Sequence, residues 1–150
     1  MDPVIDIPGL SELWQRASGG DPGVRVAIID GPVDLAHPAL AGAGVGLGQA
    51  AGVAAPSAIR SEHGTHVTSI LAGAPGGPVL GVAPNCGITV YSIYREDAAG
   101  RIEPSSQATL ALAINQCAAE GADIITISSG QQTATGQADR FLTDAVRNAA

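Results

Sequence analysis

The stretch VRVAIID, residues 24–30, lies between the turn sequences DPG and DGP and decides the fold class. It is apolar except for an arginine at position 25 and an aspartate at its end, and it is too short for a helix. Runs of this kind form strands that are buried on both faces of a parallel sheet. We therefore predict a buried parallel strand over residues 24–30.

Strand-like and helix-like segments alternate along the rest of the chain. We predict further strands around residues 45–47, over residues 87–94 and within residues 122–130. We predict helices over residues 63–73, within residues 104–121 and over residues 137–150, the last with Phe141, Leu142, Ala145 and Val146 on one face. This alternation implies right-handed βαβ crossovers, so the predicted class is α/β with a parallel sheet covered on both faces.

The composition of the 150-residue chain fits one folded domain or part of one, because 45% hydrophobic residues are enough for a core. The formal net charge is −7, and the seven lysines and arginines form no cluster, so we expect neither nucleic acid nor a membrane as partner. The sequence shows no signal peptide and no stretch of membrane-spanning length, so we expect a cytoplasmic protein.

We interpret Cys86 and Cys117 as small buried hydrophobic residues, not as disulfide or zinc-binding residues.

Polar or small residues follow the ends of several predicted strands, where functional groups of parallel sheets collect. Asp30 ends the first strand, His63 begins the next buried helix, and Gly100 and the sequence SSG at 128–130 follow later strands. Taken singly, Asp30 also fits a turn or capping residue, and His63 a capping or buried histidine. The HxxH spacing of His63 and His66 does not indicate zinc, because no carboxylate ligands at a recognisable spacing accompany it.

Four segments, in their order along the chain, resemble the subtilisin-like serine peptidases. They are VAIIDGPVDLAHPAL at 26–40, HGTHV at 63–67, LGVAP at 80–84 and IITISSG at 124–130. The resemblance implies a three-layer α/β sandwich with a mostly parallel central sheet, of which this chain holds the N-terminal half. It divides the chain into a helical lead-in at residues 1–23 and an incomplete peptidase domain at residues 24–150.

The same resemblance implies roles for two members of a catalytic triad. Asp30 matches the triad aspartate and His63 the general base, whereas His66 matches a neighbouring structural position. The chemistry agrees, because a serine hydroxyl becomes a nucleophile when a neutral imidazole takes its proton, and an aspartate on the other ring nitrogen fixes the tautomer. We therefore expect a hydrogen bond between Asp30 and His63.

A peptide-binding groove is also implied by the resemblance. Family members hold an extended peptide between two backbone segments, which match Ala98, Ala99 and Gly100, and Ser128, Ser129 and Gly130 in this chain. Small residues suit the floor of such a groove, and plain turns are the alternative interpretation. The expected binding partner is a peptide or protein substrate.

Departures from the family pattern favour a narrower group. Two sequences depart from the subtilisin pattern: DGPVD at 30–34 and SSGQQ at 128–132. Together with IPGLSELW at 7–14 and GQADRFLTDAVR at 136–147, they resemble the cyanobactin-type maturation proteases. Those proteases trim ribosomally made precursor peptides. The loop over residues 74–79 is similar to a calcium loop of secreted relatives, but Pro75 and Gly76 stand where a ligating asparagine is expected. We therefore expect no metal in this loop and no cofactor.

Two parts of the family's catalytic machinery are not found in the sequence. The G-T-S-M-[AS] stretch that carries the serine nucleophile does not occur, and neither does the oxyanion-hole asparagine after the next strand. We expect the complete form to be a serine endopeptidase. We expect this chain alone to have no hydrolytic activity. We also expect it to bind the C-terminal remainder of the domain or to self-associate. The alternative is a non-catalytic peptide-binding or scaffold module. A nucleotide-binding protein comes third, because no G-x-G-x-x-G follows VAIIDG.

Overall fold

The computed structural model describes residues 8–50, 62–96, 99, 101–103, 105–128 and 138–150. Its helices are α1 (Leu10–Ala17), α2 (Glu62–Ala72), α3 (Gln107–Ala119) and α4 (Arg140–Ala149), with a 3-10 helix, η1, at Pro38–Leu40. Its strands are β1 (Arg25–Asp30), β2 (Val45–Gly48), β3 (Gly87–Ser92), β4 (Arg95–Glu96), β5 (Ile102–Glu103) and β6 (Ile124–Ile127). Within these ranges, no helix has the length and apolar character needed to cross a membrane.

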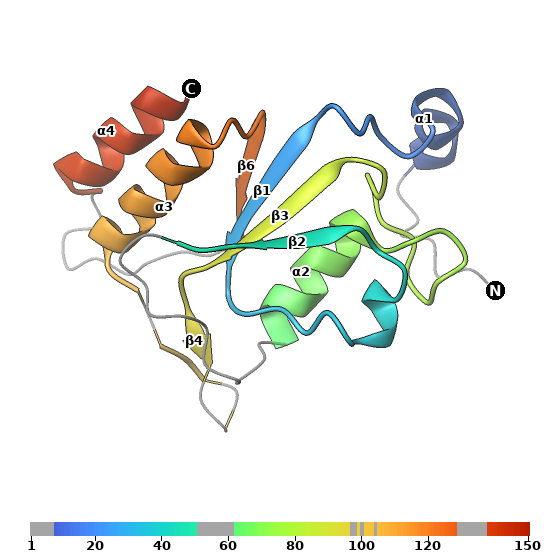
Figure 1. Ribbon diagram of the computed structural model, residues 1–150, viewed down its shortest axis with the longest axis horizontal. Coiled ribbons are helices and arrows are strands. Elements are labelled where there is room, and N and C mark those ends of the chain that lie inside the picture. The colour runs from blue at the N-terminus through green and yellow to red at the C-terminus, as the bar shows by residue number, and fades with distance from the viewer. Residues whose placement is uncertain (1–7, 51–61, 97–98, 100, 104, 129–137) are drawn as a thin grey trace.

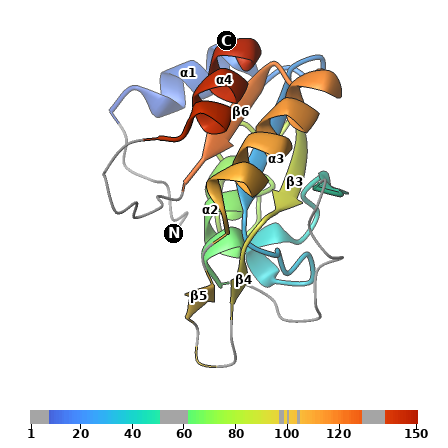
Figure 2. The same cartoon turned by 90° about the vertical axis from the view of Figure 1, so that its left-hand side faces the viewer.

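Four of the strands form one parallel sheet in the order β2-β3-β1-β6. Near the end of β1, Ile29 lies opposite Tyr91 of β3 and Ile127 of β6. Helix α2 covers one face of this sheet, and α3 and α4 cover the other (Figures 1 and 2). Strands β4 and β5 form a separate antiparallel hairpin. The predicted three-layer α/β architecture with a mostly parallel central sheet is confirmed.

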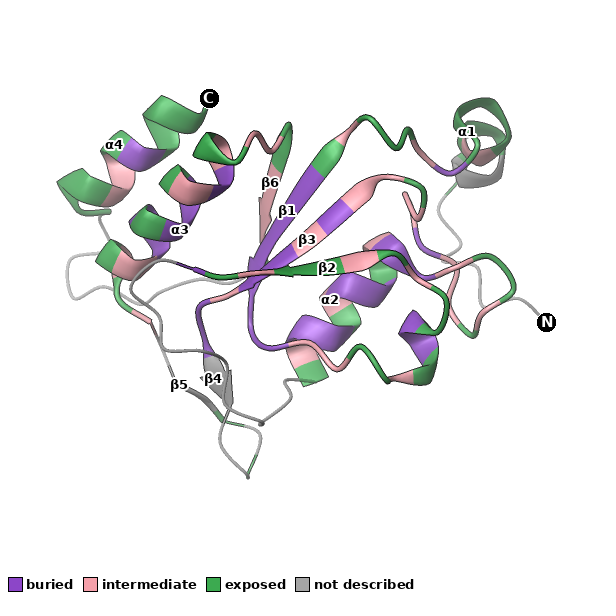
Figure 3. Cartoon of the chain, viewed as in Figure 1, coloured by how far each residue is buried: buried purple, intermediate pink, exposed green. Residues whose placement is uncertain are grey.

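Strand β1 is buried because helices cover both of its faces. Val26 and Ile28 pack in the cluster on the α2 side, and the alternate residues Ala27 and Ile29 pack in the cluster on the α3 side. Figure 3 shows that burial continues along most of the strand. A strand with two covered faces needs apolar residues at every position, which explains the uninterrupted apolar run of the sequence.

Local hydrogen bonds begin the two helices on the α3 side of the sheet. The Ser106 Oγ accepts a hydrogen bond from the Thr109 N–H at 3.0 Å, before the first turn of α3. The Asp139 carboxylate accepts one from the Leu142 N–H at 2.8 Å, before the first turn of α4. Both caps satisfy donors that the first turn of a helix leaves unpaired, so these starts are specified locally.

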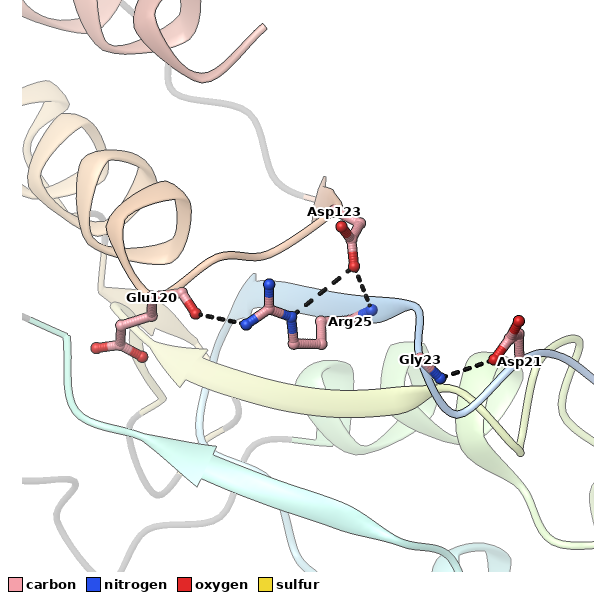
Figure 4. A network of polar contacts seen from close by, with 5 residues as sticks. All are labelled: Asp21, Gly23, Arg25, Glu120 and Asp123. Atoms are coloured by element: carbon pink, nitrogen blue, oxygen red, sulfur yellow. Dashed lines mark hydrogen bonds and ion pairs between the residues drawn. The ribbon is translucent and has the colours of Figure 1, made fainter.

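Arg25, at the start of β1, joins the end of α3 to the start of β6 (Figure 4). Its Nη1 donates a hydrogen bond to the Glu120 carbonyl at 3.2 Å, and its Nε lies 3.9 Å from the Asp123 carboxylate. The Asp123 carboxylate also accepts a hydrogen bond from the Arg25 backbone N–H at 2.8 Å. In the preceding turn, the Asp21 carboxylate accepts one from the Gly23 N–H at 2.8 Å. These contacts fix the point at which β1 enters the sheet.

Helix α1 lies at the end of the molecule opposite α4 (Figure 1). The Trp14 indole N–H donates hydrogen bonds to the carbonyls of Gly81, at 3.1 Å, and Val82, at 3.2 Å. The lead-in therefore contains a helix that contacts the loop after α2. The boundary at residue 23 stays a prediction.

Parts of the last strand and of the last helix are exposed. Ile124 of β6 is 52% exposed, and within the described residues β6 pairs with β1 alone, so its outer edge is open. On α4, Phe141 is 75% exposed and Val146 is 52% exposed. Only the Leu142 and Ala145 side of α4 packs in the core cluster with α3. The apolar face predicted for α4 is thus covered in part.

Candidate active site

Asp30 lies at the carboxyl end of β1 and is 1% exposed. Its Oδ1 accepts a hydrogen bond from the Gly31 backbone N–H at 2.6 Å. Its backbone carbonyl accepts one from the Ile93 N–H at 2.8 Å, which extends the ladder between β1 and β3. Its Oδ2 has no hydrogen-bond partner among the described residues. The carboxylate is therefore held in one orientation at the edge where parallel sheets carry their functional groups.

His63 lies in the first turn of α2 and brings its ring to this carboxylate. Its Nδ1 is 2.8 Å from Asp30 Oδ1, so the predicted hydrogen bond is present. The His63 side chain is 42% exposed, in contrast to the buried carboxylate. A carboxylate accepts hydrogen bonds and cannot donate one, so Nδ1 carries the proton of this bond. The arrangement is a partly exposed imidazole hydrogen-bonded to a buried carboxyl group.

The sequence after His63 allows α2 to begin directly against the loop that follows β1. A Cβ atom added to Gly64 would lie 2.6 Å from the Gly31 carbonyl oxygen and 3.0 Å from that of Pro32. The next residue, Thr65, accepts a hydrogen bond at its Oγ1 from the Asp34 N–H at 3.0 Å. The small residue and the hydroxyl together set the distance between the helix and the loop.

The second histidine of the pair has a different environment. His66 is exposed, and its backbone carbonyl accepts a hydrogen bond from the Ser69 Oγ at 2.8 Å. Among the described residues, no cluster of three or more His, Cys, Asp or Glu side chains is placed to bind a metal ion. The two histidines of HGTH therefore differ in burial and in hydrogen bonding.

Two of the six residues predicted to line a peptide groove are described by the structure. Ala99 lies in a turn between β4 and β5 and is exposed. Ser128 directly follows β6 and is also exposed. The other four predicted groove residues, Ala98, Gly100, Ser129 and Gly130, lie outside the described residues. The groove therefore stays a prediction.

Ser92 is a site residue that sequence reasoning missed. It ends β3, lies opposite Asp30 in the β1–β3 register, and donates a hydrogen bond from its Oγ to the Gly31 carbonyl at 3.3 Å. The sequence holds no signal for this contact, because the two residues are 61 positions apart and meet through strand pairing.

A second polar cluster lies on the opposite face of the sheet. The Tyr91 hydroxyl donates a hydrogen bond to the Glu120 carboxylate, which also accepts one from the Gln116 amide at 2.7 Å. These two donors lower the pKa of Glu120. Burial, followed by the bond to Glu120, raises the pKa of Tyr91. Burial also raises the pKa of the Cys117 thiol to about 12.

The two cysteines are free. Cys117 is fully buried in the cluster on the α3 side, and Cys86 is partly buried beside the cluster on the α2 side. A thiol with a raised pKa stays protonated near neutral pH and is a poor nucleophile. Cys117 is therefore a packing residue.

Solved structures of maturation proteases are similar to this chain. The prenylagaramide maturation protease PagA is 39% identical, with a TM-score of 0.78 over 95% of this chain and 47% of PagA. The patellamide maturation protease PatA is 40% identical, with a TM-score of 0.69 over 86% of this chain and 45% of PatA. The PatG macrocyclase in complex with peptide is 25% identical, with a TM-score of 0.73 over 95% of this chain and 52% of PatG. The chain spans about half the length of these proteins.

A family model gives the same relationship from the sequence. The model of the subtilase family matches residues 21–150. No curated protein has significant sequence similarity to the chain. The resemblance to subtilisin-like peptidases, and among them to the cyanobactin-type maturation proteases, is confirmed. The chain belongs to the subtilase family.

Proposed function

We propose that this chain supplies the aspartate and the histidine of a subtilisin-type serine endopeptidase that trims ribosomally made precursor peptides. The observation that carries the proposal is the 2.8 Å hydrogen bond between His63 Nδ1 and Asp30 Oδ1. It joins a buried carboxylate to a partly exposed imidazole at the carboxyl edge of a parallel sheet. Asp30 and His63 are the proposed catalytic residues.

His63 is the general base in this mechanism. Its Nε2 takes the proton of a serine hydroxyl while the serine oxygen attacks the scissile carbonyl. Asp30 holds the imidazole in the Nδ1–H tautomer and stabilises the imidazolium that forms. Nε2 then gives the proton to the leaving amine, and the same base activates the water that hydrolyses the acyl-enzyme.

The serine and the oxyanion-hole donors come from a second part of the domain. This proposal rests on the sequence, which contains no G-T-S-M-[AS] stretch, and on the relatives, of which the chain spans about half. The open edge of β6 is the proposed junction with that part. Ser128, next to this edge, belongs to the proposed groove and is not the nucleophile.

The substrate class rests on what the relatives do. PagA and PatA are named as maturation proteases, and the PatG macrocyclase was solved with a peptide. We propose that an extended peptide binds between residues 98–100 and residues 128–130, with main-chain hydrogen bonds supplying affinity. The exposure of Ala99 and Ser128 agrees with this placement.

The alternative function is a peptide-binding or scaffold module without catalysis. The observation that favours it is the lack of a nucleophile motif in the 150 residues of the sequence. This alternative keeps the groove and removes the need for a second part that carries serine.

The test combines the purified chain with a polypeptide that contains the part of PagA that this chain does not cover. Alone, the chain is expected to hydrolyse no peptide and to remain unlabelled by a fluorophosphonate probe. With the added part, it is expected to gain both activities. In the combined protein His63→Ala should abolish hydrolysis, because it removes the base. His66→Ala, a change of the same residue type in the same helix, should leave most of the activity.

Three results would count against the proposal. Full activity of the His63→Ala protein would remove the general base from the mechanism. Labelling of the chain alone would direct the search for a nucleophile to Ser128 or Ser129. Peptide binding without hydrolysis in the combined protein would favour the binding module.

A further inference from the structure

We infer that Ser92 is a positioning residue for the Asp30 carboxylate, an inference that rests on the proposed function of the Asp30–His63 pair. Ser92 lies opposite Asp30 in the parallel register of β1 and β3. Residues at paired positions of parallel strands point to the same face of the sheet, so Ser92 points toward the α2 layer, as Asp30 does. Ser92 is partly buried there.

Ser92 donates a hydrogen bond to Gly31, and Gly31 donates one to the Asp30 carboxylate. The Ser92 Oγ donates a hydrogen bond to the Gly31 carbonyl at 3.3 Å. The Gly31 N–H donates one to Asp30 Oδ1 at 2.6 Å. The Gly31 N–H belongs to the same planar peptide group as the Asp30 carbonyl, which the Ile93 N–H holds at 2.8 Å. The Ser92 hydroxyl holds the next peptide group at the Gly31 carbonyl, so contacts from β3 restrain both sides of a glycine whose backbone is otherwise freer than that of any other residue.

Helix α2 also lies close to the Gly31 carbonyl. A Cβ atom at Gly64 would come within 2.6 Å of this oxygen. The helix that carries His63 and the strand that carries Ser92 therefore meet at one carbonyl group. A displacement of Gly31 would change both the N–H that orients Asp30 and the surface against which the first turn of α2 rests.

The expected effect is moderate, because the Ser92 Oγ to Gly31 oxygen distance of 3.3 Å is longer than the usual hydroxyl hydrogen bond. In the combined protein, removal of this hydrogen bond is expected to lower kcat about fivefold. Ser92 has no proposed contact with the peptide, so KM should stay unchanged. This separation of kcat from KM distinguishes a positioning role from a role in substrate binding.

The test measures the tautomer of His63 in the full chain by long-range ¹H–¹⁵N spectra, at a pH at which the imidazole is neutral. Ser92→Thr keeps the hydroxyl, and Ser92→Val has almost the same shape without it. We expect the Thr variant to retain the Nδ1–H tautomer. In the Val and Ala variants the fraction of the Nε2–H tautomer should rise severalfold. The matched control is Ser69→Ala, which removes another hydroxyl bond to a backbone carbonyl, that of His66, and should leave the tautomer unchanged.

Equal tautomer fractions in the Thr and Val variants would overturn the inference, and so would an equal shift in the Ser69→Ala control. The Thr and Val pair remains informative if Ser92→Ala does not fold, because both residues suit a strand. The tautomer is measured without hydrolysis, so a shift in an inactive combined protein would contradict the proposed function and leave the role of Ser92 intact. An unchanged tautomer in an active protein would contradict the role of Ser92 alone.

Discussion

At the scale of single residues, the Asp30–His63 pair depends on a neighbour that has no side chain. Gly64 lies in α2, where alanine is ordinarily more favourable than glycine by about 1 kcal/mol. Its Cβ would nevertheless meet the backbone oxygens of Gly31 and Pro32 at 2.6 and 3.0 Å. These atoms belong to the loop that orients Asp30, so the steric conflict outweighs the gain in helix propensity.

We predict that Gly64→Ala lowers the free energy of unfolding by about 1–3 kcal/mol, the usual cost of overpacking. It should also lower the Nδ1–H tautomer fraction of His63, because the helix must move away from the loop. Urea denaturation and the ¹⁵N spectra of the imidazole measure the two effects. The control is Gly44→Ala, since a Cβ there meets no atom within 4 Å. A Gly64→Ala chain that is as stable as the Gly44→Ala chain would contradict this account.

At the scale of elements, two groups where β3 packs against the end of α3 stay protonated in the folded state. They are the Tyr91 hydroxyl and the Cys117 thiol. Burial raises the pKa of Cys117 to about 12, and burial with the Glu120 contact raises the pKa of Tyr91. In the unfolded chain these groups lose their protons near pH 8.5 and about pH 10. The folded state then binds more protons than the unfolded state, so its stability falls as the pH rises.

We predict that the free energy of unfolding decreases between about pH 8.5 and pH 12, by roughly 1.4 kcal/mol per pH unit for each group that the unfolded chain has ionised. Urea denaturation at several alkaline pH values measures this slope. Tyr91→Phe should flatten the slope above about pH 10, and Cys117→Ala should flatten it from about pH 8.5. Identical slopes in the wild-type and both variant chains would show that these two groups do not control alkaline stability.

At the scale of the whole molecule, exposed apolar side chains occur on the edge strand β6 and on α4. Ile124 of β6 and Phe141 and Val146 of α4 are each more than half exposed. A cavity of about 210 Å³ is lined by residues of α3, β6 and α4, and Val146 is one of them. An unpaired strand edge next to apolar side chains favours pairing with another polypeptide.

We predict that the isolated chain self-associates, or binds tightly to a polypeptide that pairs with β6. Sedimentation and light scattering measure the mass in solution. Ile124→Lys and Phe141→Ser should shift the chain toward the monomer, because the first adds a charge to the edge strand and the second removes exposed apolar surface from α4. Leu13→Ser, a change at a residue of α1 that is 57% exposed, is the control and should have no effect. A wild-type chain that is monomeric and stable at high concentration would refute this prediction.

Much of the fold could be predicted because its signals are local. The apolar run before Asp30, the capping residues Ser106 and Asp139, and the glycines after α2 and α3 act within a few residues of one element. Such patterns specify the order and type of elements, and alternation of strands with helices then restricts the topology to parallel crossovers. The assignment of Asp30 and His63 used the same property, since both lie at element ends within recognisable motifs.

The sequence by itself determined the α/β class, the order of the sheet strands and of the helices that cover them, and the family, but it did not predict the hairpin of β4 and β5. The tertiary structure alone decided that Ser92 lies opposite Asp30, that the Gly31 N–H holds the carboxylate, and that Gly64 approaches the Gly31 carbonyl. The physical reason is that these features depend on strand register and on packing between distant segments, and no local sequence pattern encodes either one.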